Sequence, residues 1–213
     1  MGLRGRLLSG GGLRGRGRMP GMPLAFSPPG RRGDGKMTAV IAIDVDGVLA
    51  DTHSAVFRKL GLNLTIENIT KYDFFDEIGI TRKEFWTMYK ELWSQQYQVI
   101  PLIEPDAPTI VAELRKTFRI AIVSTRPKET WSGTVAWLKL RGIQYDELRL
   151  LPPKTDKATL EYSIIVDDNP ELAQRCKNVI IYDRPWNRTV HGRRIRSLKE
   201  LLSEVRSDGD REG

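Results

Sequence analysis

The feature of this chain that most limits its fold is a series of short apolar runs separated by segments with helical patterns. The runs cover residues 40–43, 119–123, 147–151, 163–166 and 179–182, and helical patterns cover 106–117, 128–141 and 197–206. Short apolar runs of this kind are typical of strands that are buried on both faces of a parallel sheet. Strands that alternate with helices therefore predict an α/β fold built on a doubly wound parallel sheet.

The segment 51–105 interrupts this alternation. Residues 52–60 predict a helix that ends at Gly61, and residues 81–84 have the spacing of a capping box that opens a second helix running to about residue 96. We therefore expect residues 37–50 and 106–213 to form one core domain. Residues 51–105 are expected to form a small helical cap inserted into it.

Residues 1–36 differ in composition from the rest of the chain. They contain seven Arg, Lys36 and a single acid, Asp34, so they account for the whole formal net charge of +7. Eleven glycines and four prolines without a helical or strand period predict a disordered basic Arg/Gly-rich tail. It is either an extension without function or the result of a start assigned too early, because Met37 directly precedes a natural first strand.

The rest of the chain is electrically balanced, which argues against a broad nucleic-acid-binding surface on the folded part. An alternative of another class keeps nucleic acid as a partner of the Arg/Gly tail, with the domain as a scaffold. No apolar run approaches the roughly 20 residues that cross a bilayer, and the single cysteine, Cys176, has no internal disulfide partner. We expect a cytoplasmic protein without a membrane partner.

Polar side chains follow three of the predicted strands at the point where each strand ends. They are Asp44 and Asp46, Ser124 and Thr125, and Asp167 and Asp168. The carboxyl ends of parallel strands meet at one edge of the sheet, where ligands bind in such folds. A carboxylate there can attack phosphorus, a second can protonate the leaving oxygen, and Mg²⁺ takes carboxylate oxygens as ligands. The pattern therefore predicts cleavage of a phosphate ester with Mg²⁺ as cofactor.

The same residues resemble the motifs of the haloacid dehalogenase (HAD) superfamily of phosphatases. The stretch 44–49 (Asp-Val-Asp-Gly-Val-Leu) is similar to the first motif, Ser124 to the second, Lys157 to the third and the acid pair 167–168 to the fourth. Lys154 is another candidate for the third motif, but the ten-residue spacing to Asp167 favours Lys157. The resemblance implies a HAD-like, Rossmann-like core with a small helical cap.

The resemblance also implies catalytic roles for three residues. Asp44 is expected to be the nucleophile, which forms an aspartyl-phosphate, and also a metal ligand. Asp46 is expected to act as general acid and then as general base, with its backbone carbonyl on Mg²⁺. Lys157 is expected to neutralise charge between nucleophile and phosphate.

Further residues are expected to bind substrate or metal. Ser124 and Thr125 are expected to hold phosphate oxygens, and Arg126 to bind phosphate or sugar, with a surface ion pair as the alternative. Asp168 is expected to bind the metal, and Asp167 to lie beside it, either as a ligand or as a partner of the ligands.

Within the superfamily, the sequence resembles the 5'(3')-deoxyribonucleotidase and 5'-nucleotidase branch. The similarity lies in residues 46–51 (Asp-Gly-Val-Leu-Ala-Asp) and 182–188 (Tyr-Asp-Arg-Pro-Trp-Asn-Arg), and in the motif spacing. It implies a nucleoside or deoxynucleoside monophosphate as substrate and aromatic cap residues around its base, although Thr52 stands where other members can carry an aromatic residue. The aromatic candidates of this cap are Tyr72, Phe74, Phe75, Phe85, Trp86, Tyr89, Trp93 and Tyr97.

Several alternatives remain open at this stage. The helical spacing of the aromatic residues 85, 86, 89, 93 and 97 favours packing for most of them, with one or two facing the substrate. The substrate is alternatively another sugar or acid phosphate, because the cap sets specificity. A phosphotransferase or mutase is a further alternative, since such members can retain the acid at Asp46.

Overall fold

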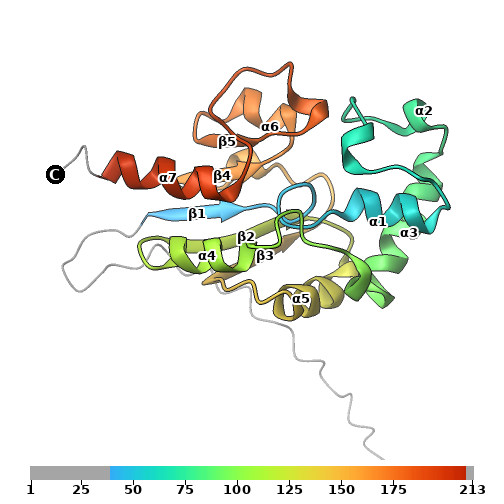
Figure 1. The fold of residues 1–213 in the computed structure, drawn as a ribbon, viewed down its shortest axis with the longest axis horizontal. Coiled ribbons are helices and arrows are strands. Elements are labelled where there is room, and N and C mark those ends of the chain that lie inside the picture. The colour runs from blue at the N-terminus through green and yellow to red at the C-terminus, as the bar shows by residue number, and fades with distance from the viewer. Residues whose placement is uncertain (1–38, 210–213) are drawn as a thin grey trace, which may run out of the picture.

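The computed structural model describes residues 39–209, so the predictions made for residues 1–36 lie outside the described part of the chain. Six parallel strands form one sheet in the order β3-β2-β1-β4-β5-β6 (Figure 1). They are β1 (Val40–Ile43), β2 (Arg119–Thr125), β3 (Glu147–Leu151), β4 (Ile164–Asp167), β5 (Val179–Tyr182) and β6 (Arg194–Ile195). The predicted α/β fold class is confirmed.

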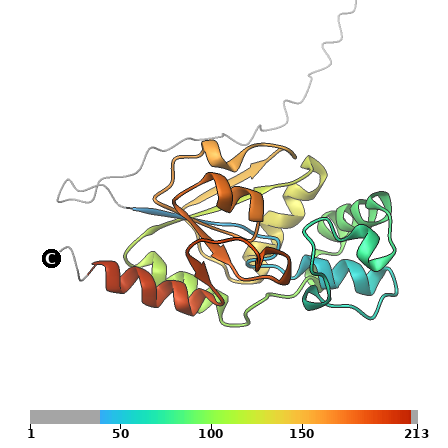
Figure 2. The same cartoon turned by 90° about the horizontal axis from the view of Figure 1, so that it is seen from above.

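Helices cover both faces of the sheet. One face carries α4 (Ala107–Arg115), α5 (Trp131–Leu140) and α7 (Leu198–Gly209), which pack on a core that includes Ile41 and Ile43 of β1. The other face carries α6 (Pro170–Arg175), whose Leu172 packs with Val40 and Ala42 of the same strand. Figure 2 shows α4 and α7 side by side, and the two helices are in contact. Because both faces of β1 are covered, all four of its residues are buried.

Three helices lie between β1 and α4 in the chain, beyond the carboxyl end of β1 (Figures 1 and 2). They are α1 (Thr52–Lys59), α2 (Phe75–Ile78) and α3 (Arg82–Gln95). The predicted capping box is present at the start of α3, where the Thr81 hydroxyl accepts the backbone N–H of Glu84. All three fall inside the segment 51–105, and we refer to them below as the cap helices.

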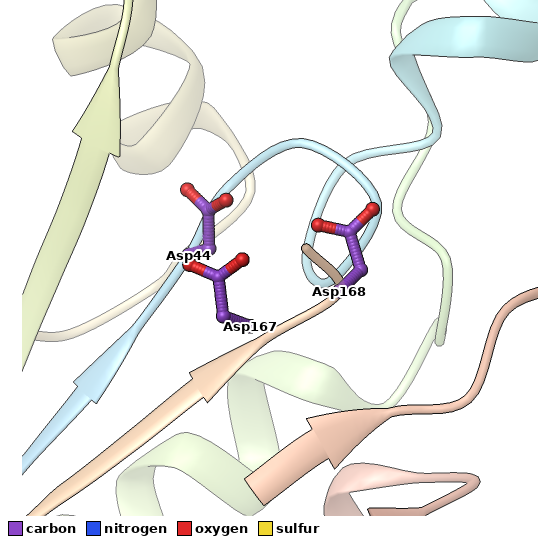
Figure 3. A group of neighbouring side chains, drawn as sticks. All are labelled: Asp44, Asp167 and Asp168. Atoms are coloured by element: carbon purple, nitrogen blue, oxygen red, sulfur yellow. The ribbon is translucent and has the colours of Figure 1, made fainter. Parts of the chain in front are cut away.

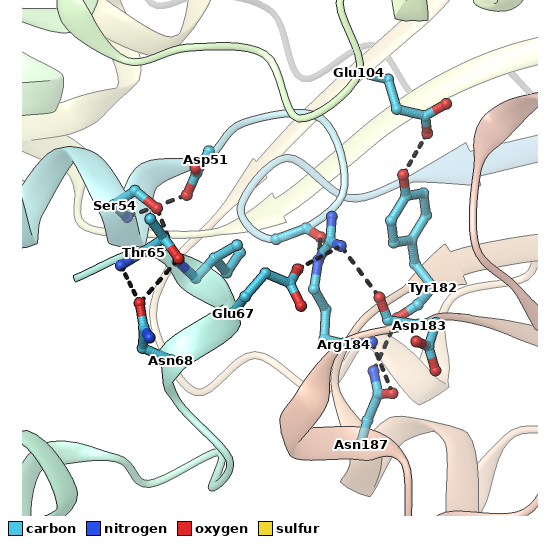
Figure 4. Close-up of polar contacts among 12 residues, drawn as sticks. Asp51, Ser54, Thr65, Glu67, Asn68, Glu104, Tyr182, Asp183, Arg184 and Asn187 are labelled. Atoms are coloured by element: carbon cyan, nitrogen blue, oxygen red, sulfur yellow. Dashed lines mark hydrogen bonds and ion pairs between the residues drawn. The ribbon is translucent and has the colours of Figure 1, made fainter.

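Contacts between the segment 51–105 and the core include one from α3 and one from the 3₁₀ helix that follows α1. Helix α3 contacts α5 at Gly133, where an added Cβ would meet the backbone oxygen of Trp93. On the other side, the 3₁₀ helix η1 (Ile66–Asn68) brings Glu67 opposite Arg184, at 4.0 Å between Oε1 and Nη1 (Figure 4). The Ser54 hydroxyl of α1 fixes η1 in place by accepting the backbone N–H of Ile66.

Candidate active site

Three carboxylates lie together at the carboxyl ends of two neighbouring strands (Figure 3). Strands β1 and β4 pair directly, with Ile43 opposite Val166, and the backbone N–H of Asp44 donates to the carbonyl of Val166 at 3.0 Å. Asp44 follows β1, and Asp167 and Asp168 end and follow β4. All three are buried, and one oxygen of each lies within 4.8 Å of the others. The structure thus brings together the nucleophile and metal ligands expected from the sequence.

Lys157 bridges two of these acids. Its Nζ lies 2.8 Å from Asp44 Oδ2 and 2.7 Å from Asp167 Oδ2, and the side chain is 8% exposed. The short 3₁₀ helix η4 (Lys157–Thr159) carries it, and the Asp156 carboxylate caps that helix by accepting the N–H of Ala158. Lys157, the candidate favoured by its spacing, therefore makes the contacts expected of the third-motif lysine.

Burial and mutual repulsion make this group of charges unusual. Burial raises the pKa of the Asp44 carboxyl to about 6, although the charge of Lys157 opposes the rise. The pKa of Asp168 is raised well above its ordinary value by burial and then by the charges of Asp167 and Asp44. Burial alone would lower the pKa of the Lys157 ammonium, but the charges of Asp167 and Asp44 outweigh it and raise that pKa.

The acidic residues suit Mg²⁺. This ion prefers oxygen ligands and is commonly bound by carboxylates together with waters and substrate phosphate. The three carboxylates and the single ammonium of Lys157 leave an excess of two negative charges, which a divalent cation balances. Burial raises the pKa values of Asp44 and Asp168, and the repulsion between carboxylates at such short separations adds to the rise. Asp44, Asp167 and Asp168 therefore fit the predicted metal site.

The loop after β1 is held close to Asp168. Gly47 has φ of +77°, and an added Cβ would lie 2.2 Å from Asp168 Oδ2. Arg184 supports the loop from the other side, because its Nε donates to the Gly47 carbonyl at 2.7 Å. Asn187 and Trp186 donate to the backbone carbonyl of Asp168 at 2.9 and 3.3 Å. The sequence does not predict these supporting roles, although residues 182–188 resemble a segment of nucleotidase-like proteins.

The Asp46 carboxylate bonds three residues that lie outside the three-acid group. Its Oδ1 accepts the hydroxyl of Thr52, and its Oδ2 accepts Tyr89 Oη at 2.8 Å and Arg126 Nη2 at 2.7 Å. The carboxylate is 21% exposed, whereas the Arg126 side chain is fully buried. The structure therefore places Asp46 beside the cap helices, two residues from the expected nucleophile.

The three residues predicted to bind phosphate lie at the end of β2, but they face different surroundings. Thr125 lines a pocket that also contains Asp44, Lys157 and Asp167. Ser124 is 2% exposed, and its hydroxyl accepts Nε and Nη2 of Arg126. With no exposed surface, the Arg126 guanidinium has no open face for a phosphate. Arg126 forms a buried ion pair with Asp46, at 2.7 Å between Nη2 and Oδ2, whereas the alternative expected from the sequence was an ion pair at the surface.

The aromatic cap residues divide into packing and exposed groups. Five are buried, and they are Phe74, Phe75, Phe85, Tyr89 and Trp93. Trp86 is exposed, and Tyr97 is partly buried against the core. Tyr72 is 48% exposed and lines the pocket that holds Asp44 and Lys157. This distribution agrees with the expectation that most of these side chains pack.

The parallel sheet and its strand order match the fold of solved haloacid dehalogenase-like hydrolases. A haloacid dehalogenase-like hydrolase of Streptococcus pneumoniae aligns with 79% of this chain and 98% of its own, with a TM-score of 0.52 and 17% identity. A presumed phosphatase of Clostridium acetobutylicum aligns with 80% of this chain and 99% of its own, with a TM-score of 0.53 and 11% identity. At these identities the likeness concerns the fold.

The family is given by the sequence. Residues 38–206 match the model of the family described as 5' nucleotidase, deoxy (pyrimidine), cytosolic type C protein, and the chain belongs to this family. A presumed nucleotidase of Halalkalibacterium halodurans is 24% identical over 161 residues, which cover 68% of this chain and 80% of that protein. The predicted resemblance to nucleotidase-like HAD phosphatases is confirmed. No helix among residues 39–209 is long and apolar enough to cross a membrane.

Proposed function

We propose that this enzyme hydrolyses nucleoside or deoxynucleoside 5'-monophosphates through an aspartyl-phosphate on Asp44, with Mg²⁺ as cofactor. The observation that carries the proposal is the position of Asp44. Its carboxylate is held by Lys157 at 2.8 Å, lies among the acids of the metal site and lines the same pocket as Thr125. A nucleophile, a cation and a phosphate-binding side chain thus share one opening. The cytoplasmic location expected from the sequence is part of this proposal.

The proposed reaction has two steps. In the first, an oxygen of Asp44 forms a bond to phosphorus while the bond to the nucleoside oxygen breaks, and a proton from Asp46 goes to that leaving oxygen. In the second, water attacks phosphorus and gives its proton to Asp46. The acyl-phosphate bond breaks, which returns Asp44 and releases inorganic phosphate. The net reaction consumes one water and no other reactant.

The surrounding residues have separate tasks in this scheme. Lys157 offsets the negative charge of Asp44 as that carboxylate approaches an anionic phosphate. Mg²⁺ bound by Asp44, Asp167 and Asp168 would add positive charge at the phosphate oxygens. Thr125 offers a hydroxyl to the same group, and Tyr72 is the cap residue at this pocket that can touch the leaving nucleoside.

Phosphate release from a panel of phosphomonoesters tests the proposal. The panel contains ribo- and deoxynucleoside monophosphates together with sugar and acid phosphates, each with and without Mg²⁺. We expect Mg²⁺-dependent release that is highest for nucleotides and is abolished by Asp44→Asn. Highest release from a sugar or acid phosphate would reject the nucleotide assignment. Release that survives Asp44→Asn would reject the aspartyl-phosphate.

A further inference from the structure

The carboxylate of Asp46 is held by donors from three separate elements. Thr52 opens α1, Tyr89 lies in the middle of α3, and Arg126 follows β2. All three side chains are buried, with exposures of 1% for Thr52, 4% for Tyr89 and 0% for Arg126. Donors on both carboxylate oxygens restrict rotation of the group, so its direction is set by residues distant in sequence.

Arg126 joins Asp46 to the residue expected to bind phosphate. Its Nη2 lies 2.7 Å from Asp46 Oδ2 and 3.0 Å from Ser124 Oγ, and its Nε lies 3.2 Å from the same hydroxyl. A serine hydroxyl has two acceptor lone pairs and one proton. Because the guanidinium occupies the acceptor side, the Ser124 proton is left to be donated to another group. One arginine therefore orients a carboxylate and turns a neighbouring hydroxyl into a donor.

The guanidinium itself has little freedom to move. Its plane lies over the ring of Trp93, with 4.4 Å between Cζ and the ring centroid, and Nη1 contacts the Thr134 hydroxyl. Trp93 lies one helical turn after Tyr89 on α3, so this helix contacts both Asp46 and the arginine that pairs with it. A buried arginine that loses its carboxylate is strongly unfavourable, so the pair with Asp46 is maintained as long as α3 stays packed.

We propose that Tyr89 and Arg126 are positioning residues for proton transfer by Asp46, and that α3 makes this transfer depend on the packing of the cap helices against the core. The proposal rests on the role given to Asp46 in the proposed function. Neither residue touches the substrate. Tyr89 and Arg126 hold the carboxyl group where it meets the leaving oxygen, and Arg126 also holds Ser124.

The dependence of kcat/KM on the leaving group distinguishes residues that position Asp46 from residues that only stabilise the fold. A nucleoside alkoxide is a poor leaving group that needs a proton, whereas p-nitrophenolate leaves without one. We compare kcat/KM for a deoxynucleoside 5'-monophosphate with kcat/KM for p-nitrophenyl phosphate, because this parameter reports the step in which the ester bond breaks. Partial unfolding lowers both values equally, so their ratio reports only on the proton transfer.

In Tyr89→Phe we expect the nucleotide value to fall about tenfold and the p-nitrophenyl phosphate value to fall less than about threefold. Arg126→Lys keeps the charge but cannot contact Asp46 and Ser124 together, so we expect a larger change of the ratio in the same direction. Tyr162→Phe is the matched control. Its hydroxyl also bonds a carboxylate, that of Glu147 at 3.0 Å, but this contact lies away from Asp46, and the ratio stays as in the wild type.

An Asp46→Asn background completes the test. Once the acid is removed, Tyr89→Phe should change the ratio no further, because the two substitutions act on one interaction. A wild-type ratio in both Tyr89→Phe and Arg126→Lys would overturn the positioning role. An additional change of the ratio in the Asp46→Asn background would also overturn it. Failure of the proposed function is seen separately, as wild-type enzyme that releases no phosphate from either ester.

Discussion

Replacement of Gly47 by alanine tests the closest approach in the active site. Gly47 has φ of +77°, a conformation that costs an L-residue with a Cβ about 1–2 kcal/mol. In addition, the new Cβ would lie 2.2 Å from Oδ2 and 2.7 Å from Cγ of Asp168. Asp168 is 5% exposed, so its side chain has no open space to enter. The overlap must displace either the loop or the carboxylate that is expected to bind Mg²⁺.

Gly61→Ala provides the matched control. Gly61 has φ of +75°, and an added Cβ would find nothing within 4 Å. The control therefore introduces only the strain of a positive φ, without a steric overlap. We expect this strain to lower the melting temperature by about 2–4 °C per kcal/mol in a domain of this size. Gly47→Ala should lower it further and should raise the Mg²⁺ concentration for half-maximal activity about tenfold or more, because displaced partners of a metal ligand weaken metal binding.

The two variants are compared by thermal unfolding followed by circular dichroism and by Mg²⁺ titration of phosphate release. The reasoning is refuted if Gly47→Ala matches Gly61→Ala in melting temperature and also keeps the wild-type Mg²⁺ dependence. That result would mean that the loop and Asp168 are not in contact.

Three other predictions concern stability. Gly133→Ala should lower the melting temperature more than Gly61→Ala, because the new Cβ would lie 1.5 Å from the backbone oxygen of Trp93 and separate α3 from α5. Mg²⁺ at about 100 times its dissociation constant should stabilise the fold by roughly 2.7 kcal/mol in thermal unfolding, and Asp168→Asn should reduce the effect. The third prediction concerns Asp146. Burial alone would raise the pKa of its carboxyl group, but hydrogen bonds from Arg115 and from a backbone N–H outweigh burial and lower that pKa. The stabilisation is therefore present above the ordinary pKa of 3.8 and is lost as the pH falls through the lowered value. The difference in melting temperature between wild type and Asp146→Asn should accordingly be about 1–3 °C at pH 7 and vanish in acid.

The sequence predicts a strand where the strand's own residues form a recognisable apolar run. In β1, β2, β4 and β5 apolar residues alternate between two buried faces, so a continuous apolar run is visible without knowledge of the partner strands. The two residues of β6 carry no such signal. Arg194 pairs opposite Ile181 and donates to Asp183 and Asn187, so this strand exists through contacts that only the folded chain provides.

The same distinction applies to the site. The acids at 44, 167 and 168 were predictable because each lies at the end of a readable strand, and parallel pairing brings such ends together. The partners of Asp46 were not, because Tyr89 and Arg126 are 43 and 80 residues away in the chain and meet it only once α3 has packed on the core. From its position in the sequence, Arg126 is expected to bind substrate. Its burial against the Trp93 ring depends on contacts that form only in the folded chain.

Under the proposed function, the balance of charge explains how a site with so many acids can accept an anionic substrate. Arg126 pairs with Asp46, and Arg184 faces Glu67 at 4.0 Å, so neither acid adds an unopposed negative charge to the site. Mg²⁺ would cancel the two charges left by the three-acid group and Lys157, which brings the pocket close to neutrality before substrate arrives. Two of the three N–H donors of the Lys157 ammonium bond the carboxylates of Asp44 and Asp167. The third donor has no partner among residues 39–209 and is available to a phosphate oxygen in the proposed reaction, so a single lysine can hold the Asp44 carboxylate and draw the phosphate toward it.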